Sequence, residues 1–173
     1  MRALAQKLRR TEAAEIAEAA LVMPVVFMFL LGIIWFGRAF NIYSTITQAA
    51  QQGAIVAARP TCATCGSTFA FDTTVATAVT SVMQASSLDP TRIKSGITQP
   101  GCTASSNIQI CRQVILNSTT TGSPPQACTA GTQSQICGVT VSFQYPFQFY
   151  LPFTSLNLSE IVLNAQGQSR MEN

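Results

Sequence analysis

The feature that most constrains this chain is an uncharged, largely apolar run from Ala19 to Gly37, bounded by Glu18 and Arg38. As an α-helix the run would rise about 28 Å, close to the hydrocarbon thickness of a bilayer. A cleaved secretory signal has a shorter apolar core followed by small residues, whereas this run has the aromatic residues Trp35 and Phe36 near its end. The run therefore predicts a retained transmembrane helix. The alternative is a buried core helix of a soluble protein.

The basic residues and the cysteines predict the orientation of this helix. Four of the ten basic residues lie within the first ten positions, which favours a cytoplasmic N-terminus. All six cysteines follow the apolar run: Cys62, Cys65, Cys102, Cys111, Cys128 and Cys137. An even number confined to one side of a membrane indicates disulfides in an oxidising compartment, either the periplasm or the cell exterior.

An internal similarity suggests how four of the cysteines pair. CTASSNIQIC, from Cys102 to Cys111, resembles CTAGTQSQIC, from Cys128 to Cys137. We interpret these as two similar loops, each closed by its own disulfide, which leaves Cys62 to pair with Cys65 within CATC. A redox-active CxxC begins a helix after a strand, and a four-cysteine zinc site needs two such pairs. The CATC segment fits neither pattern well, so a structural disulfide is favoured over both.

The composition argues against catalysis and nucleic-acid binding. Histidine is absent, which removes nucleophile pairs that use it as a base and every metal site that uses it as a ligand. Asp72, Asp89, Lys94 and Glu160 lie far apart in the sequence. No basic stripe with interleaved aromatic residues occurs. We therefore expect no enzyme, no cofactor, no metal site and no nucleic-acid partner.

The helical pattern continues beyond the apolar run. No helix breaker occurs between Arg38 and Arg59, and Pro60 ends the pattern, so we predict one helix from about Glu12 to Ala58. Small residues form two rows at four-residue spacing: Ala49, Gly53, Ala57 and Ala50, Ala54, Ala58. Such rows permit close backbone approach. Packing against the protein's own sheet is favoured over a subunit interface, although different faces can serve both.

A second, short helix is expected after the CATC segment. Asp72 is a candidate N-cap for a helix over Thr73–Ser87, and Pro90 closes that segment. The apolar residues Val75, Val79, Val82 and Met83 recur at helical spacing on one face.

The remaining chain is predicted to be mainly strands. They span Arg92–Thr98, Ile108–Asn117, Val139–Tyr150 and Ser159–Ser169. In the third, apolar and polar residues alternate from Val139 to Tyr145, as in a half-buried antiparallel strand, and Pro146 is expected to bulge or break it. The predicted fold class is α+β: a long N-terminal transmembrane-plus-stalk helix, a short second helix and a small antiparallel sheet with disulfide-bonded loops. The expected segments are residues 1–18 (cytoplasmic), 19–37 (transmembrane), 38–59 (helical stalk) and 60–173 (extracytoplasmic domain).

The succession of these segments resembles the TadE-like family, pseudopilin-type membrane proteins linked to assembly of tight-adherence (Flp) pili. The resemblance is carried by the basic N-terminus, by EAALVMPVVFMFLLGIIWFGRAF and by QAAQQGAIVAARP. The C-terminal VTVSFQYPFQFYLPF and IVLNAQGQSRMEN are similar to that family's closing strands and final Arg-x-Glu, here Arg170 to Glu172. Roughly the first 58 and last 35 residues are covered, and the cysteine-bearing middle is not. Because 173 residues leave no space for a von Willebrand-type domain, the short TadE form is favoured over the larger TadG form.

The resemblance implies roles for residues near the start of the apolar run. Glu18 would meet the N-terminal amine of a neighbouring subunit, since an ion pair is much stronger in a low dielectric than in water. Alternatively, Glu18 only complements the helix dipole. Pro24 would kink the helix or weaken its hydrogen bonding. Prepilin peptidases usually cut after a glycine five residues before the glutamate, and Ala13 occupies that place. Cutting there frees the amine of Ala14; without it the protein remains a permanent anchor.

The function implied is structural: a minor pseudopilin or membrane-anchored assembly component of a Flp/Tad-type pilus with a pilin-like fold. It would lie in the bacterial inner membrane, with its C-terminal domain periplasmic or extracellular, or in a cell-surface filament. Its partners would be the lipid bilayer, other pilin-like subunits, pilus-assembly proteins and further copies of itself. The alternatives are a major filament subunit and a membrane-tethered thiol-disulfide or ligand-binding module that uses Cys62 and Cys65.

Overall fold

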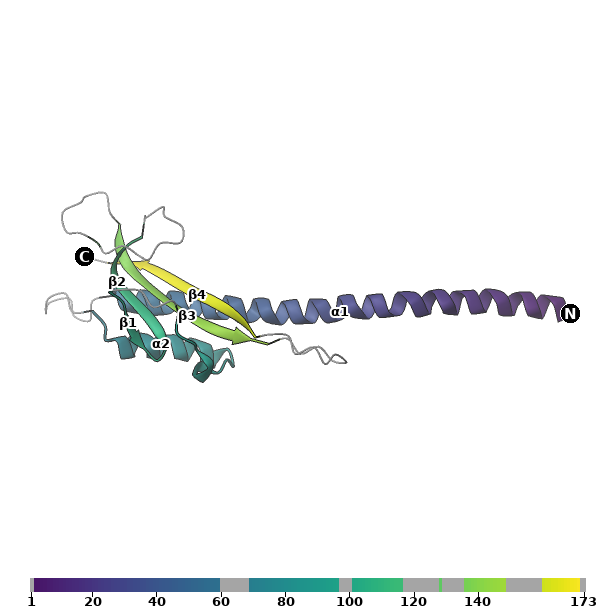
Figure 1. The fold of residues 1–173 in the computed structure, drawn as a ribbon, viewed down its shortest axis with the longest axis horizontal. Helices are drawn as coiled ribbons and strands as arrows, with labels where there is room; N and C mark the ends of the chain where they lie inside the picture. Colours follow the sequence, from purple (N-terminus) through teal and green to yellow (C-terminus); the bar gives the residue numbers. More distant parts are fainter. Residues whose placement is uncertain are drawn as a thin grey trace. The chain divides into compact units, whose positions relative to one another are not determined.

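The computed structural model describes residues 2–59, 69–96, 101–116, 128, 136–148 and 160–171. It has the predicted α+β architecture, with helices α1 (Arg2–Ala58) and α2 (Asp72–Ala85) and a short 3₁₀ turn, η1 (Pro90–Arg92). The strands are β1 (Thr103–Ser105), β2 (Ile108–Ile115), β3 (Cys137–Phe147) and β4 (Ile161–Arg170). They form one antiparallel sheet in the order β1-β2-β3-β4 (Figure 1).

The chain divides into two compact units, Met1–Phe40 and Asn41–Asn173. In the second unit, helices pack on one face of the sheet. Side chains on that face of β3 are almost completely buried: Val139, Val141, Phe143 and Tyr145. These are the residues whose alternation predicted a half-buried strand. The core of the domain therefore lies between this face of the sheet and the helices.

Helix α1 ends at Ala58, as predicted from Pro60, but begins at Arg2, ten residues before the predicted start. Pro24 lies inside the helix. From Asn41 onward α1 belongs to the second unit, and all six small residues of the two predicted rows are buried there: Ala49, Ala50, Gly53, Ala54, Ala57 and Ala58. These rows are thus enclosed by the protein's own domain and are not available to a partner helix.

Two glycines allow the close approach of α1 to its neighbours. A Cβ placed on Gly53 would lie 2.6 Å from Cγ2 of Val79 in α2. A Cβ on Gly167 of β4 would lie 2.3 Å from both the carbonyl carbon and the oxygen of Ala50. The backbones of α1 and β4 are therefore in direct contact, which a side chain at position 167 would prevent.

The apolar face of α2 is the predicted one, with Val75, Val79 and Met83 buried. The role predicted for Asp72 is wrong. Phe71 occupies the N-cap position without a side-chain bond, and the Asp72 carboxylate instead accepts a hydrogen bond from Arg112 Nη1 at 2.5 Å. A long-range cation thus outcompetes the local capping bond for this carboxylate.

Helix α2 ends at Ala85, not at the predicted Ser87. Ser87 adopts the left-handed conformation (φ 58°) and donates its N–H to the Gln84 carbonyl, while Leu88 donates to the Met83 carbonyl, both at 2.9 Å. This is the hydrogen-bond pattern of a Schellman motif, which terminates a helix by satisfying its last carbonyls. The helix therefore stops before Pro90, which opens η1 instead.

We predict that Ser87→Gly stabilises the second unit, because glycine adopts the left-handed conformation without the strain of a Cβ. The free energy of unfolding should rise by about 0.5–1 kcal/mol, after allowance for the greater flexibility of glycine in the unfolded chain. Ser86→Gly is the matched control. Ser86 has φ −98°, so glycine relieves no strain there, and the free energy of unfolding of this variant should fall or stay unchanged. Urea-induced unfolding measures both variants; an equal response of the two would contradict the argument.

The strand predicted over Arg92–Thr98 is wrong in its described part. Pro90–Arg92 form η1, whose N-cap Asp89 accepts from the Thr91 hydroxyl and N–H at 2.7 and 2.9 Å. These two hydrogen bonds, with a smaller contribution from the cation of Arg92, lower the pKa of the Asp89 carboxyl. Lys94 then forms an isolated bridge with Gln144 of β3. The proline and the Asp89 cap thus favour a 3₁₀ turn over a strand at the start of this segment.

Strand β1 was not predicted. Ser105 pairs with Ile108, so β1 and β2 are joined by a two-residue turn in which Ser106 and Asn107 both have positive φ (50° and 65°). Such φ values are typical of a type I′ hairpin turn, for which asparagine is well suited. The SN dipeptide was the available sequence signal.

Strands β2, β3 and β4 confirm three predicted strands with shorter or shifted ends. Contrary to prediction, β3 passes through Pro146 with no register shift against β4. Lys94 and Gln144 exchange backbone hydrogen bonds at 2.9 and 3.0 Å, so the polar backbone groups of Gln144 face away from β4. The backbone carbonyl of Pro146, two residues further along β3, and the position of its missing N–H also face away from β4. Its missing N–H therefore costs the β3–β4 ladder nothing.

Candidate functional site

The described part of the chain contains one helical stretch long and apolar enough to cross a membrane. It is the Glu15–Ala58 part of α1, with a mean hydropathy of 2.5 in its most apolar window and none of that window buried. Large apolar side chains from Leu21 to Phe40 are exposed, including Phe29 at 70% and Phe36 at 73%. This fits a single-pass membrane anchor, because water would penalise so large an exposed apolar surface.

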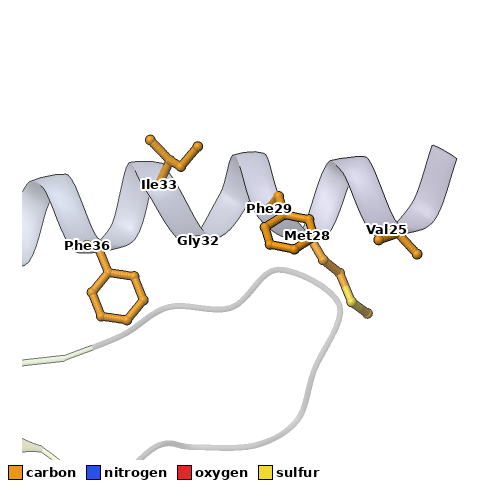
Figure 2. A pocket seen from close by; sticks show the side chains of 6 residues that line it. All are labelled: Val25, Met28, Phe29, Gly32, Ile33 and Phe36. Carbon is orange, nitrogen blue, oxygen red and sulfur yellow. The ribbon is translucent and has the colours of Figure 1, made fainter. Parts of the chain in front are cut away.

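The apolar surface of the first unit is interrupted at Gly32. Figure 2 shows Val25, Met28 and Phe36 projecting to one side of the helix and Ile33 to the other. A Cβ on Gly32 would meet nothing within 4 Å. At the end of the apolar run the Arg38 guanidinium lies 6.0 Å from the Trp35 ring centroid. An aromatic residue with a neighbouring cation is typical of a membrane–water boundary.

The residues assigned to helix association and processing all lie on α1. Glu18 is exposed and lies in the same helix as Pro24. Ala13 and Ala14 lie further toward the start of α1, and their side chains are outside the described part. The structure thus places these residues on one helix without bringing them into a cluster.

Two disulfides join the cysteines of the repeated loops. Cys102 pairs with Cys111 and Cys128 with Cys137, with Cα–Cα distances of 4.3 and 6.0 Å. The register of β1 and β2 places Cys102 directly opposite Cys111, so this bridge extends the hairpin by one pair. Cys62 and Cys65 lie outside the described residues, and so does the predicted disulfide between them.

A β-bulge beside the second disulfide positions an ion pair that sequence reasoning missed. The β2–β3 register shifts between Cys111 and Val114, so Arg112 and Gln113 together oppose one residue, Val139. Arg112 binds the Asp72 carboxylate through Nη1 and the Ala70 carbonyl through Nη2 at 2.7 Å. The Gln113 carbonyl accepts the N–H of Cys128 at 2.7 Å. The bulge therefore joins the start of α2 and the second disulfide to the sheet.

The described residues hold no group of three or more potential metal ligands. The arrangement combines an exposed apolar helix with a disulfide-bonded α+β unit, which suits anchoring and protein association. Residues 13–54 match the family model described as TadE-like protein. The match confirms the resemblance drawn from the sequence and covers less than half of the chain.

The TadE-like segment includes Glu18, Pro24, the whole apolar run and most of the small-residue rows. Because the family is linked to tight-adherence pili, the match supports involvement of this chain in Tad pilus-related assembly. No curated protein and no solved structure matches the chain. The disulfide-bonded sheet lies beyond the matched residues.

Proposed function

We propose that this protein is a structural, non-enzymatic, membrane-anchored component of Tad-type pilus assembly, acting as a minor pseudopilin. The observation that carries the proposal is the coincidence of the TadE-like match with the exposed apolar part of α1. In this proposal the N-terminus is cytoplasmic, the helix crosses the inner membrane and the second unit lies outside. The two disulfides support an oxidising location for that unit.

Lateral association would use the exposed apolar surface of the first unit. The six small residues of the stalk support this assignment indirectly, because they are buried within the second unit. Gly32 offers a point on the apolar surface where a partner helix can approach the backbone closely. Glu18 is exposed near the start of the apolar run, where a neighbouring N-terminal amine could reach it.

Processing at the N-terminus tests the proposed role. Intact mass is measured after expression of the full chain with an active prepilin peptidase and with an inactive one. A pseudopilin should yield a species that begins at Ala14 only with the active enzyme. Ala13→Gly is the matched control, because it restores the glycine at which such peptidases usually cut and should be cleaved fully.

A wild-type chain that keeps its N-terminus while Ala13→Gly is cleaved would contradict the pseudopilin role. The function would then be that of an assembly factor that remains in the membrane. Electron microscopy of overexpressing cells addresses the major-subunit alternative, since abundant filaments built of this chain would contradict a minor role.

A further inference from the structure

The outer edge of β4 is an open row of backbone donors and acceptors. Strand β4 lies at the edge of the sheet, next to β3 (Figure 1). Because the backbone groups of Gln144 face away from β4, those of Phe143 and Tyr145 face it and bond their partners Ala165 and Leu163. The even-numbered residues of β4 therefore direct their N–H and C=O groups outward. Among the described residues no backbone group pairs with that edge.

This edge lacks the features that usually protect an edge strand. All ten residues of β4 pair with β3 in one unbroken register, without a bulge, and the strand contains no proline. No charged residue occurs between Glu160 and Arg170. Val162 is 39% and Ile161 43% exposed, so apolar surface is also available there. Long, regular and uncharged edges are templates for the addition of another strand.

The charged residues at the two ends of β4 differ in whether they form an ion pair. Glu160 at one end is already paired with Lys94. Arg170 at the other end is exposed and forms no ion pair with any carboxylate of the described residues. An incoming strand would therefore meet a neutral centre and one cation that has no carboxylate partner among the described residues. A carboxylate opposite Arg170 would complement this pattern.

The fold argues against a second copy of the same chain as the occupant. In Figure 1, β4 and the adjoining part of α1 run in the same direction. Antiparallel pairing of two β4 strands about a twofold axis would make those parts of α1 run in opposite directions, which does not suit two copies whose helices both leave one membrane, as the proposed function requires. The other edge strand, β1, has only three residues and offers a short pairing surface.

We infer that the outer edge of β4 is a docking site for an extended segment of a different extracytoplasmic chain, uncharged except for one carboxylate that meets Arg170. Main-chain hydrogen bonds from alternate residues supply the binding, and the terminal carboxylate sets the register. This inference goes beyond the proposed function: its choice of an extracytoplasmic partner rests on the membrane orientation proposed there, but it does not depend on processing of the N-terminus.

The test uses the full-length protein in detergent micelles and two synthetic peptides as long as β4. Both alternate threonine and valine; one begins with an acetylated glutamate, which antiparallel pairing places at Arg170, and the other begins with an acetylated lysine. Amide hydrogen exchange is followed at Val162, Asn164, Gln166 and Gln168. The glutamate peptide should slow exchange at these positions by about tenfold or more at saturation. It should bind up to about fivefold more tightly than the lysine peptide, a difference that Arg170→Gln should remove.

Two variants at one position separate edge pairing from binding elsewhere. Gln166→Pro removes an outward N–H at the centre of the edge but leaves the β3–β4 bonds intact, so the fold should persist and binding should fall by about tenfold. Gln166→Thr keeps the N–H and should bind as the wild type does. Unchanged binding by Gln166→Pro, or no protection by either peptide, would overturn the proposal.

Exchange in the absence of peptide checks the choice of occupant. The alternate amides should exchange rapidly at every protein concentration. Protection that rises with protein concentration would show that copies pair with each other, and protection independent of concentration would show that the chain covers its own edge. Either result would overturn a docking site for a different chain.

Discussion

Replacement of Gly167 by alanine should cause the largest loss of stability of any single methyl addition considered in this protein. The new Cβ would lie 2.3 Å from the carbonyl carbon and oxygen of Ala50 and 2.5 Å from the nitrogen of Gln51. All three are backbone atoms of α1, so no side-chain rotation can relieve the overlap. The helix or the strand would have to move, which would separate the buried alanines of α1 from the sheet.

The expected loss is about 3 kcal/mol or more of the free energy of unfolding, at the upper end of the range for overpacked cores. Gly53→Ala should cost less, because its nearest contact is a methyl group of Val79 and not backbone. Gly96→Ala is the matched control: its Cβ would lie 3.4 Å from the Ser142 hydroxyl, an ordinary contact, so stability should change by less than about 1 kcal/mol.

Pulse proteolysis in a urea series measures these variants on the full-length protein in detergent micelles, because the unfolded second unit is cut while the folded unit survives. The order of loss should be Gly167→Ala, then Gly53→Ala, then Gly96→Ala. Equal stability of the Gly167 and Gly96 variants would contradict the direct contact between α1 and β4.

Removal of the Cys102–Cys111 disulfide should be the second large effect. In the chain-entropy description, a bridge between residues nine apart in sequence stabilises a protein by about 3 kcal/mol, because it restricts the unfolded chain. The double variant Cys102→Ala/Cys111→Ala should lose that amount. Alanine is preferred to serine here because Cys111 is buried at 2% exposure, and a hydroxyl there would add a separate cost.

The second disulfide provides an internal comparison. Cys128 and Cys137 have the same sequence separation, so Cys128→Ala/Cys137→Ala should lose a similar amount if restriction of the unfolded chain dominates. A much larger loss in one variant would instead indicate folded-state contacts, such as the bond from Cys128 to the bulge at Gln113. Intact mass without reductant verifies the remaining bridge, and pulse proteolysis measures stability. No loss in either variant would contradict a stabilising role for these bridges.

Several features of this protein follow from the sequence because they depend on neighbours along the chain. The apolar run from Ala19 to Gly37 and the proline at position 60 determine an uninterrupted helix and its end. The spacing of Val75, Val79 and Met83 determines the buried face of α2, and alternation determines the inner face of β3. The similarity of the two cysteine loops predicted both bridges, since a short loop brings its own ends together.

Other features required the tertiary structure, because they depend on groups distant in sequence. The Asp72 carboxylate leaves its expected capping role for Arg112, forty residues away, which a bulge in β2 places beside it. Pro146 remains inside β3 because its missing N–H would face away from β4, so the β3–β4 ladder loses no hydrogen bond. The contact of Gly167 with α1 and the open edge of β4 are likewise set by packing and strand order. Periodicity reveals which face of an element is buried, whereas only the assembled fold determines what that face and its edges meet.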